Sequence, residues 1–179
     1  MAWHHQHKQQ TRQRILSSAA RLFAQKGFDH VGIDEVMADA GLTRGAFYAH
    51  FKNKSELYAK AIVAGALQAA EQYSSDAPAD EIVDRYLSID HVQGVHTHCP
   101  LAFLTSDISQ RDTQVRHAYT RVFNGLVARL QQGDTCREKA IQQAILMVGG
   151  VAISRALDDP ELVDELLNVC RQLSPLKTA

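Results

Sequence analysis

Residues 32–57 read GIDEVMADAGLTRGAFYAHFKNKSEL and carry the strongest structural signal in this 179-residue chain. Apolar residues recur at helical spacing up to Gly41, and Phe47 and Phe51 lie one turn apart after Thr43. Glycine favours the end of a helix, and threonine favours the position before one. The segment therefore predicts two short helices joined by a tight turn.

An amphipathic helix precedes this pair and ends at Gly27. It has a single apolar stripe, formed by Ile15, Leu16, Ala19, Leu22 and Phe23. Three helices with a tight glycine-containing turn before the last one are typical of a helix-turn-helix unit, whose last helix enters the DNA major groove. We expect its core to contain Leu22, Phe23, Ile33, Val36, Phe47 and Phe51.

The helix after Thr43 predicts the DNA contacts. Arg44 suits a guanine edge because its planar fork donates two parallel hydrogen bonds, and Gly45 permits close approach to the groove. Tyr48 is rotated away from the buried phenylalanines, so its hydroxyl faces a phosphate. His50 suits a base edge or a phosphate, and Lys52 a phosphate. The expected DNA-binding residues are Gly32, Thr43, Arg44, Gly45, Ala46, Tyr48, His50, Lys52 and Lys54.

The run Ala40–Leu57 resembles the tetracycline-repressor (TetR/AcrR) family, together with Arg14–Ile15–Leu16, Ala19–Ala20, Leu22–Phe23 and Gly27–Phe28. The resemblance covers roughly residues 10–60. It implies an all-α homodimeric transcription factor, usually a repressor that a small ligand releases from operator DNA. It also implies phosphate contacts for Tyr48 and Lys54. Gly32 departs from the family pattern, in which threonine or serine often caps the second helix and touches phosphate, so only a backbone contact survives here.

Helical periodicity continues to the C-terminus without strand-like alternation. Asn53 and Glu56 form a capping-box variant that opens a longer helix. Further helices are expected over roughly 79–91, after Pro100, and over 115–130, 135–157 and 158–173. The sequence therefore predicts an all-α fold of about nine helices. We expect a helix-turn-helix DNA-binding domain over 1–52 and an effector-binding and dimerisation domain over 53–179.

Charge is divided unevenly along the chain, although the net charge is only −1. Residues 1–60 hold nine basic and five acidic side chains, whereas the remainder holds ten basic and fifteen acidic ones. A basic first third is typical of a segment that faces a polyanion. A chance asymmetry between two solvated surfaces is the alternative interpretation.

The last two predicted helices have almost no polar face. A helix that is apolar all round must be covered on two sides. We expect a four-helix interface with a second copy, although these helices are alternatively the central ones of a single subunit. The expected interface residues are Ala144, Ile145, Val148, Val151, Ala152, Leu162, Leu166 and Leu167.

A pocket for a small-molecule effector is expected between the helices of the second domain. Its candidate lining residues are Tyr86, His91, His98, Phe103, Tyr119, Phe123 and Met147, each of which is alternatively ordinary core. No cofactor is indicated. The sequence gives no identity for the effector.

A cluster of histidines and one cysteine permits an alternative kind of regulator. His91, His96, His98 and Cys99 lie within nine residues, which permits a metal-responsive or redox-responsive regulator. Their spacing does not match paired zinc ligands, so we predict no metal site. A helical protein–protein adaptor is another alternative. We do not expect an enzyme, because no recognised set of nucleophile, base and orienting residue is present. Residues 3–8 suit a free tail, a minor-groove arm or, least of all, a metal site.

Composition predicts a cytoplasmic protein with no membrane partner. The longest apolar run, Ala144–Ile153, has ten residues and is too short to cross a bilayer. No secretory signal is visible at the N-terminus. Cys99, Cys136 and Cys170 are odd in number and scattered, which fits a reducing compartment.

Overall fold

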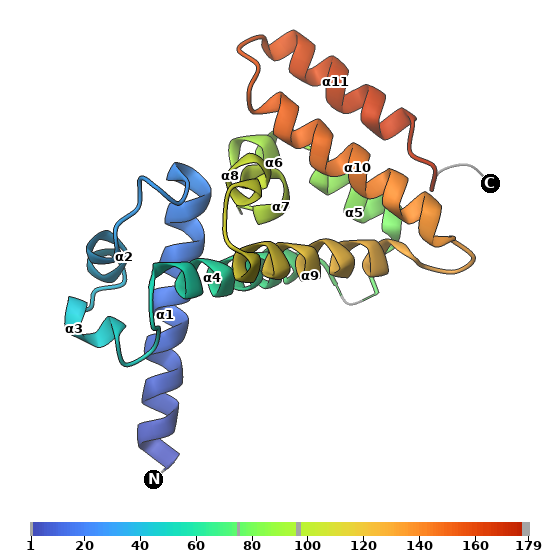
Figure 1. Ribbon diagram of the computed structural model, residues 1–179. Helices are drawn as coiled ribbons and strands as arrows, with labels where there is room; N and C mark the ends of the chain where they lie inside the picture. Colours follow the sequence, from blue (N-terminus) through green and yellow to red (C-terminus); the bar gives the residue numbers. More distant parts are fainter. Residues whose placement is uncertain (1, 75, 96–97, 177–179) are drawn as a thin grey trace.

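The computed structural model describes residues 2–74, 76–95 and 98–176, and within them the chain is entirely helical, as predicted (Figure 1). The elements are α1 (Ala2–Lys26), α2 (Ile33–Asp39), α3 (Arg44–Phe47), α4 (Lys54–Ala70), α5 (Ala79–Tyr86), α6 (Ile89–Gln93), α7 (Pro100–Phe103), α8 (Thr105–Ser109), α9 (Thr113–Leu130), α10 (Arg137–Ser154) and α11 (Pro160–Gln172). No described helix is long and apolar enough to span a membrane.

Two breaks raise the number of helices in the described residues from the expected nine to eleven. The helix expected over 79–91 is α5 followed by α6, because the Ser88 hydroxyl accepts a hydrogen bond from the His91 backbone and caps a new helix. The short helix expected after Pro100 is α7 followed by α8, with Leu104 between them at φ −122°.

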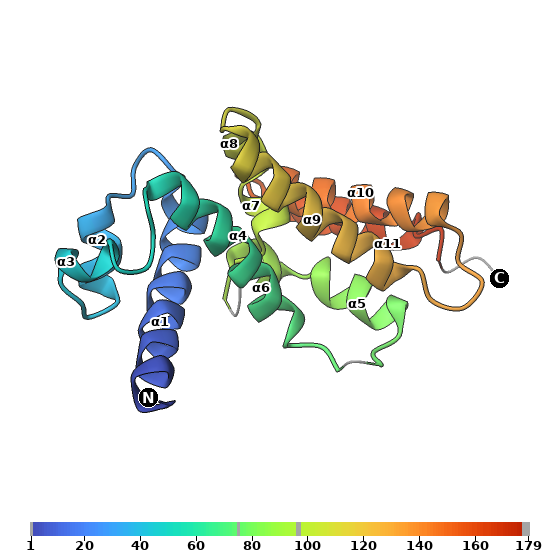
Figure 2. The same ribbon diagram turned by 60° about the horizontal axis from the view of Figure 1, so that its bottom comes forward.

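The N-terminal segment also differs from the favoured expectation. A free tail was the first interpretation of residues 3–8, yet α1 begins at Ala2 and is continuous to Lys26. Both views show the start of α1 projecting past α3 (Figure 2).

The helix-turn-helix unit and α10–α11 lie at opposite ends of the molecule, with α4 and α9 between them (Figures 1 and 2). The expected core of the unit is buried, although Ile33 is only half-buried. This core continues into α4, α8 and α9 through Tyr58, Ile108 and Val115. A second core joins α5, α7, α9, α10 and α11. The helix-turn-helix unit is therefore packed directly against α4, α8 and α9.

Candidate nucleic-acid interface

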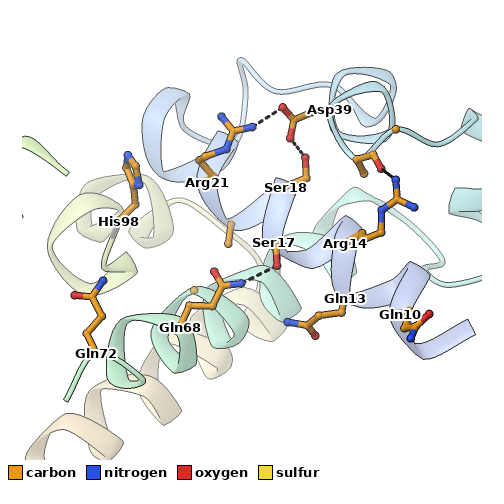
Figure 3. Close-up of a pocket in the computed structure, with 14 residues that line it drawn as sticks. Gln10, Gln13, Arg14, Ser17, Ser18, Arg21, Asp39, Gln68, Gln72 and His98 are labelled. Carbon is orange, nitrogen blue, oxygen red and sulfur yellow. Dashed lines mark hydrogen bonds and ion pairs between the residues drawn. The ribbon is translucent and has the colours of Figure 1, made fainter. Parts of the chain in front are cut away.

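The turn between α2 and α3 is held by α1. Gly41 has φ +65°, a left-handed conformation that suits glycine. Arg14 Nη2 donates to the carbonyl of Ala40 at 2.6 Å, so an arginine of α1 satisfies the last turn of α2. Asp39 accepts from the Ser18 hydroxyl and pairs with Arg21, and these contacts lower the pKa of its carboxyl (Figure 3). The position of α2 is therefore fixed by three side chains of one helix.

The helix α3 has a buried side and an outward side. Phe47 and Phe51 are buried, whereas Tyr48 is 61% exposed and its ring meets that of Phe47 edge to face. Thr43, Arg44 and Gly45 are exposed, and Ala46 is half-buried against the core. A Cβ added to Gly45 would meet nothing within 4 Å in the described chain. Gly45 therefore leaves space on the outward face, which packing inside the protein does not require.

Two of the expected DNA-binding cations have partners within the protein. Arg44 Nη1 lies 2.6 Å from Asp34 Oδ2, and both side chains are mostly exposed. Exposed ion pairs contribute little to stability, so a base edge can replace Asp34. Lys54 Nζ lies 4.1 Å from the ring centroid of Phe28, and partial burial lowers the pKa of its ammonium. Lys52 is exposed. Lys52 therefore presents its charge more freely than Lys54 does.

His50 connects α3 with α1. Its Nδ1 is buried without a hydrogen-bond partner in the described residues. Burial lowers the pKa of this imidazole, and the nearby charges of Lys8 and Arg12 lower it further. Arg12 also stacks over Phe51 at 5.2 Å. Sequence reasoning placed Lys8 in the segment that suits a tail or a minor-groove arm and did not single out Arg12, although their i, i+4 spacing already puts both on one helical face.

Gly32 is exposed and precedes α2 in an extended conformation with φ −86° and ψ 157°. A Cβ there would meet only the Asp34 nitrogen, at 4.0 Å. The helix start therefore presents backbone alone.

A polar cluster that sequence reasoning missed links the helix-turn-helix unit to α8. Arg111 makes two hydrogen bonds to the Asp29 carboxylate, at 3.1 and 2.7 Å, and also donates to the Asp107 carboxylate at 2.8 Å and to the Asp107 carbonyl at 3.2 Å. Asp107 also accepts from the Tyr58 hydroxyl, and the Arg111 guanidinium lies 4.6 Å from the Phe28 ring centroid. Burial and the Asp107 carboxylate raise the pKa of Tyr58. The turn after α1 is thus tied to α4 and α8.

Comparison with known proteins agrees with this geometry. Residues 15–61 match the family described as bacterial regulatory proteins, tetR family. The HTH-type transcriptional regulator AcrR of Shigella flexneri is 49% identical over 55 residues, which are 31% of this chain and 26% of that protein. The chain therefore matches only about a quarter of the length of this curated relative.

Solved structures extend the likeness to the whole fold. The reduced form of E. coli NemR has a TM-score of 0.74 at 17% identity, covering 95% of this chain and all of that one. A TetR-family transcriptional regulator from Cytophaga hutchinsonii has a TM-score of 0.72 at 20% identity, covering 93% of this chain and 94% of that one. Residues 15–61 are therefore similar in sequence to the tetR family, and the described chain shares the fold of these solved structures.

The chain contains a cavity of about 810 Å³ beside α4, α5, α7 and α9. Tyr86 and His91 line it, as expected, together with Cys99, Leu101 and others. His98 instead lines a separate groove of about 1090 Å³ along α1, α2 and α4, where Gln68 donates to Ser17 at 2.7 Å (Figure 3).

Four other expected pocket residues are not among those that line the cavity, which corrects the sequence prediction. Met147 is fully buried in the second core, and Phe123 packs against that core. The Tyr119 hydroxyl donates to the Leu101 carbonyl at 2.8 Å. Phe103 lies between the rings of His91 and His98, with the Arg155 guanidinium 3.6 Å from its centroid. Two of these residues contact residues that line the cavity: Tyr119 bonds to Leu101, and Phe103 packs against His91.

The expected dimer residues divide between two faces. Ala144, Val151 and Leu167 are buried within the single chain, so these three leave the proposed interface. Ile145 is 59% exposed and Leu162 42% exposed, whereas Val148, Ala152 and Leu166 are half-buried. Ile153, Val169 and Leu173, which belong to the same two predicted apolar helices, are also exposed. Exposed apolar residues therefore lie on both α10 and α11.

The metal-responsive and redox-responsive alternatives gain no support from the described residues. They contain no group of three or more histidine, cysteine or acidic side chains that could hold a metal ion, and His96 lies outside them. Cys99 is buried, and burial raises the pKa of its thiol. A reactive cysteine needs an accessible thiolate, which this environment disfavours.

Proposed function

We propose that this protein is a cytoplasmic transcriptional repressor that binds operator DNA as a homodimer and is released by a small molecule. The observation that carries the proposal is the outward face of α3. Arg44 and Tyr48 are exposed there, Gly45 leaves open space, and Phe47 and Phe51 are buried on the other side of the helix. A helix-turn-helix presents this part of its last helix to base edges. In this account residues 1–52 bind DNA and residues 53–179 hold the effector and the partner subunit.

The homodimer is supported by the exposed apolar residues of α10 and α11. Exposed apolar residues gathered on one surface are typical of a protein interface. A two-fold dimer also presents two recognition helices to two half-sites on the DNA.

Release by an effector is supported by a continuous set of contacts. Leu101 lines the cavity, and its carbonyl accepts from Tyr119 and from Thr105, the first residue of α8. The same short helix carries Asp107, which holds Tyr58 and Arg111 beside the helix-turn-helix unit. A ligand that moves α7 would therefore bias the position of α8 and, through Asp29, the DNA-binding domain.

The proposal is tested with fluorescence anisotropy on duplexes from the DNA upstream of the gene. Replacing Arg44 with alanine removes a base contact, so affinity for the bound sequence falls by about 1–3 kcal/mol and discrimination against a scrambled duplex is lost. Lys8→Ala weakens both duplexes alike and reduces the salt slope by about 1. Arg116→Ala, on the exposed side of α9, serves as the control and changes neither affinity. Equal loss on both duplexes in Arg44→Ala would remove Arg44 as a base reader.

A further inference from the structure

The cavity beside α4 and α9 has apolar sides and a buried end. Its sides come from α4 and α9 and include Val63, Ala66, Leu67, Val122 and Leu126. Its buried end comes from α5 and the start of α7, through Ile82, Tyr86, Cys99 and Leu101, each at most 6% exposed. An occupant is therefore surrounded mainly by hydrocarbon.

The polar groups at the buried end are uncharged. The Tyr86 hydroxyl is buried, and its partner is the Cys99 sulfur at 3.5 Å, which is a weak acceptor. Burial raises the pKa of Tyr86 well above its ordinary value, so the hydroxyl keeps its proton. A strong O–H donor without a strong acceptor is an uncommon arrangement in a buried site.

His91 adds an acceptor beside this donor. Its Nδ1 lies 2.6 Å from the Tyr86 carbonyl oxygen, which can only accept, so Nδ1 carries the proton. Burial lowers the pKa of His91, and the ring is therefore neutral with a lone pair on Nε2. Phe103 and Tyr86 pack against the imidazole, with ring centroids 6.1 and 4.2 Å away. Donor and acceptor thus come from two adjacent, fixed side chains.

Most of the charged residues that line the cavity are exposed, namely Asp84, Arg85, Asp90 and Arg121. Arg129 is half-buried, and its guanidinium donates to the Ser74 carbonyl at 2.6 Å. Arg85 donates to the Gln72 carbonyl at 2.8 Å and stacks over Tyr73. Both signs of charge are present and both are in contact with water, so they provide no buried partner for an ionic ligand.

We propose that this cavity binds an uncharged, largely apolar molecule with one hydroxyl or carbonyl oxygen, and that this oxygen contacts Tyr86 and His91. An ionic group at the buried end would lose its hydration without gaining an opposite charge. A pure hydrocarbon would leave the Tyr86 donor with only its sulfur partner. The inference rests on the proposed function only in calling this molecule the effector.

Three probes of one shape test the ligand class: naphthalene, 2-naphthol and 2-naphthoate, titrated into the full chain at pH 7 and followed by calorimetry. We expect 2-naphthol to bind at least tenfold more tightly than 2-naphthoate. Its advantage over naphthalene should be about two- to tenfold, the contribution of one buried hydrogen bond. Tighter binding of 2-naphthoate, or no binding of any probe, would overturn the proposal.

Two matched variants locate the oxygen. Tyr86→Phe keeps the packed ring, so we expect it to abolish the advantage of 2-naphthol over naphthalene while leaving naphthalene binding unchanged. Tyr119→Phe also removes a partly buried hydroxyl, but one that donates to Leu101 and does not line the cavity, so the advantage should persist. An unchanged advantage in Tyr86→Phe would contradict the assignment.

Binding and release are measured separately, so the two proposals fail in different ways. If 2-naphthol binds as predicted but leaves the anisotropy of a DNA complex unchanged, the ligand class stands and this probe is not an effector. If no duplex binds at all, the proposed function fails while the calorimetric result still decides the ligand class.

Discussion

Single residues decide whether α3 can enter a groove, and Gly45 is the most informative of them. Glycine within a helix costs up to about 1 kcal/mol relative to alanine, and a Cβ at this position meets nothing within 4 Å among the described residues. Packing within the described residues would therefore allow a larger residue than glycine at this position. In the proposed function, close contact with DNA is the reason for this glycine.

Gly45→Ala separates stability from binding. We expect the free energy of unfolding to stay constant or rise by up to about 1 kcal/mol, because helix propensity improves. DNA affinity should fall at least tenfold, because the added methyl group meets the groove. Urea denaturation and anisotropy measure the two effects. Gly125→Ala, also in open space but on α9, should change stability in the same direction and leave DNA affinity intact. Unaltered affinity in Gly45→Ala would contradict the docking of α3.

His91 makes stability depend on pH. Its folded pKa is below the ordinary 6.5, so its contribution to stability is complete above pH 6.5 and is lost as the pH falls below that value. Urea denaturation between pH 7.5 and 5 should show a decreasing free energy of unfolding. His50 and His98 are shifted in the same direction, so His91→Asn should reduce the decrease without removing it. An identical pH dependence in this variant would contradict a buried neutral His91.

At the scale of elements, the α2–α3 turn depends on a glycine and on an arginine from α1. A Cβ at Gly41 would come 2.9 Å from Arg14 Nη2, the atom that donates to Ala40. Gly41→Ala should therefore lower the free energy of unfolding by about 1–2 kcal/mol, the cost of a left-handed conformation for an L-residue, plus the loss of the Arg14 contact. Gly133→Ala has a similar φ of +55° and open space, so it reports the conformational cost alone. Equal effects of the two variants would show that Arg14 is not involved.

Some helix boundaries that depend on hydrogen bonds between residues close together in the sequence were predicted correctly. Asn53 accepts from the Glu56 backbone and the Lys52 backbone donates to Glu56, which is the predicted capping box. The break between α5 and α6 was missed because Ser88 acts through a hydrogen bond that competes with a continuous apolar pattern. The buried and exposed sides of α3 followed from spacing alone.

Contacts between residues far apart in the sequence could not be predicted from residue spacing. Asp107 and Arg111 lie one turn apart in the sequence, but only the fold brings them to Asp29, 82 positions from Arg111. Periodicity likewise marked α10 and α11 as apolar all round but could not tell which side packs inside the chain. Ala144 and Val151 were therefore assigned to the wrong face. Several pocket residues were predicted wrongly for the same reason. An aromatic residue packed next to a cavity and one that lines it have the same spacing in the sequence.

At the scale of the whole molecule, the proposed homodimer rests on the exposed apolar residues of α10 and α11. Ile145→Arg puts a charge in place of an exposed apolar side chain of α10, so the proposed dimer should dissociate at micromolar concentration, as measured by sedimentation velocity. Ile89→Arg, on the partly exposed α6, is the control and should leave the mass unchanged. A wild-type protein that is monomeric at these concentrations would contradict the interface.

The central claim is that the outward face of α3 binds duplex DNA in a sequence-dependent way. It is tested most directly by the equilibrium affinity of the full chain for a duplex from upstream of its own gene and for a scrambled duplex, each at several salt concentrations. The account predicts that the upstream duplex binds about a thousandfold or more tightly, and that both affinities fall as salt rises. Equal affinities for the two duplexes, or no salt-sensitive binding to either, would contradict it.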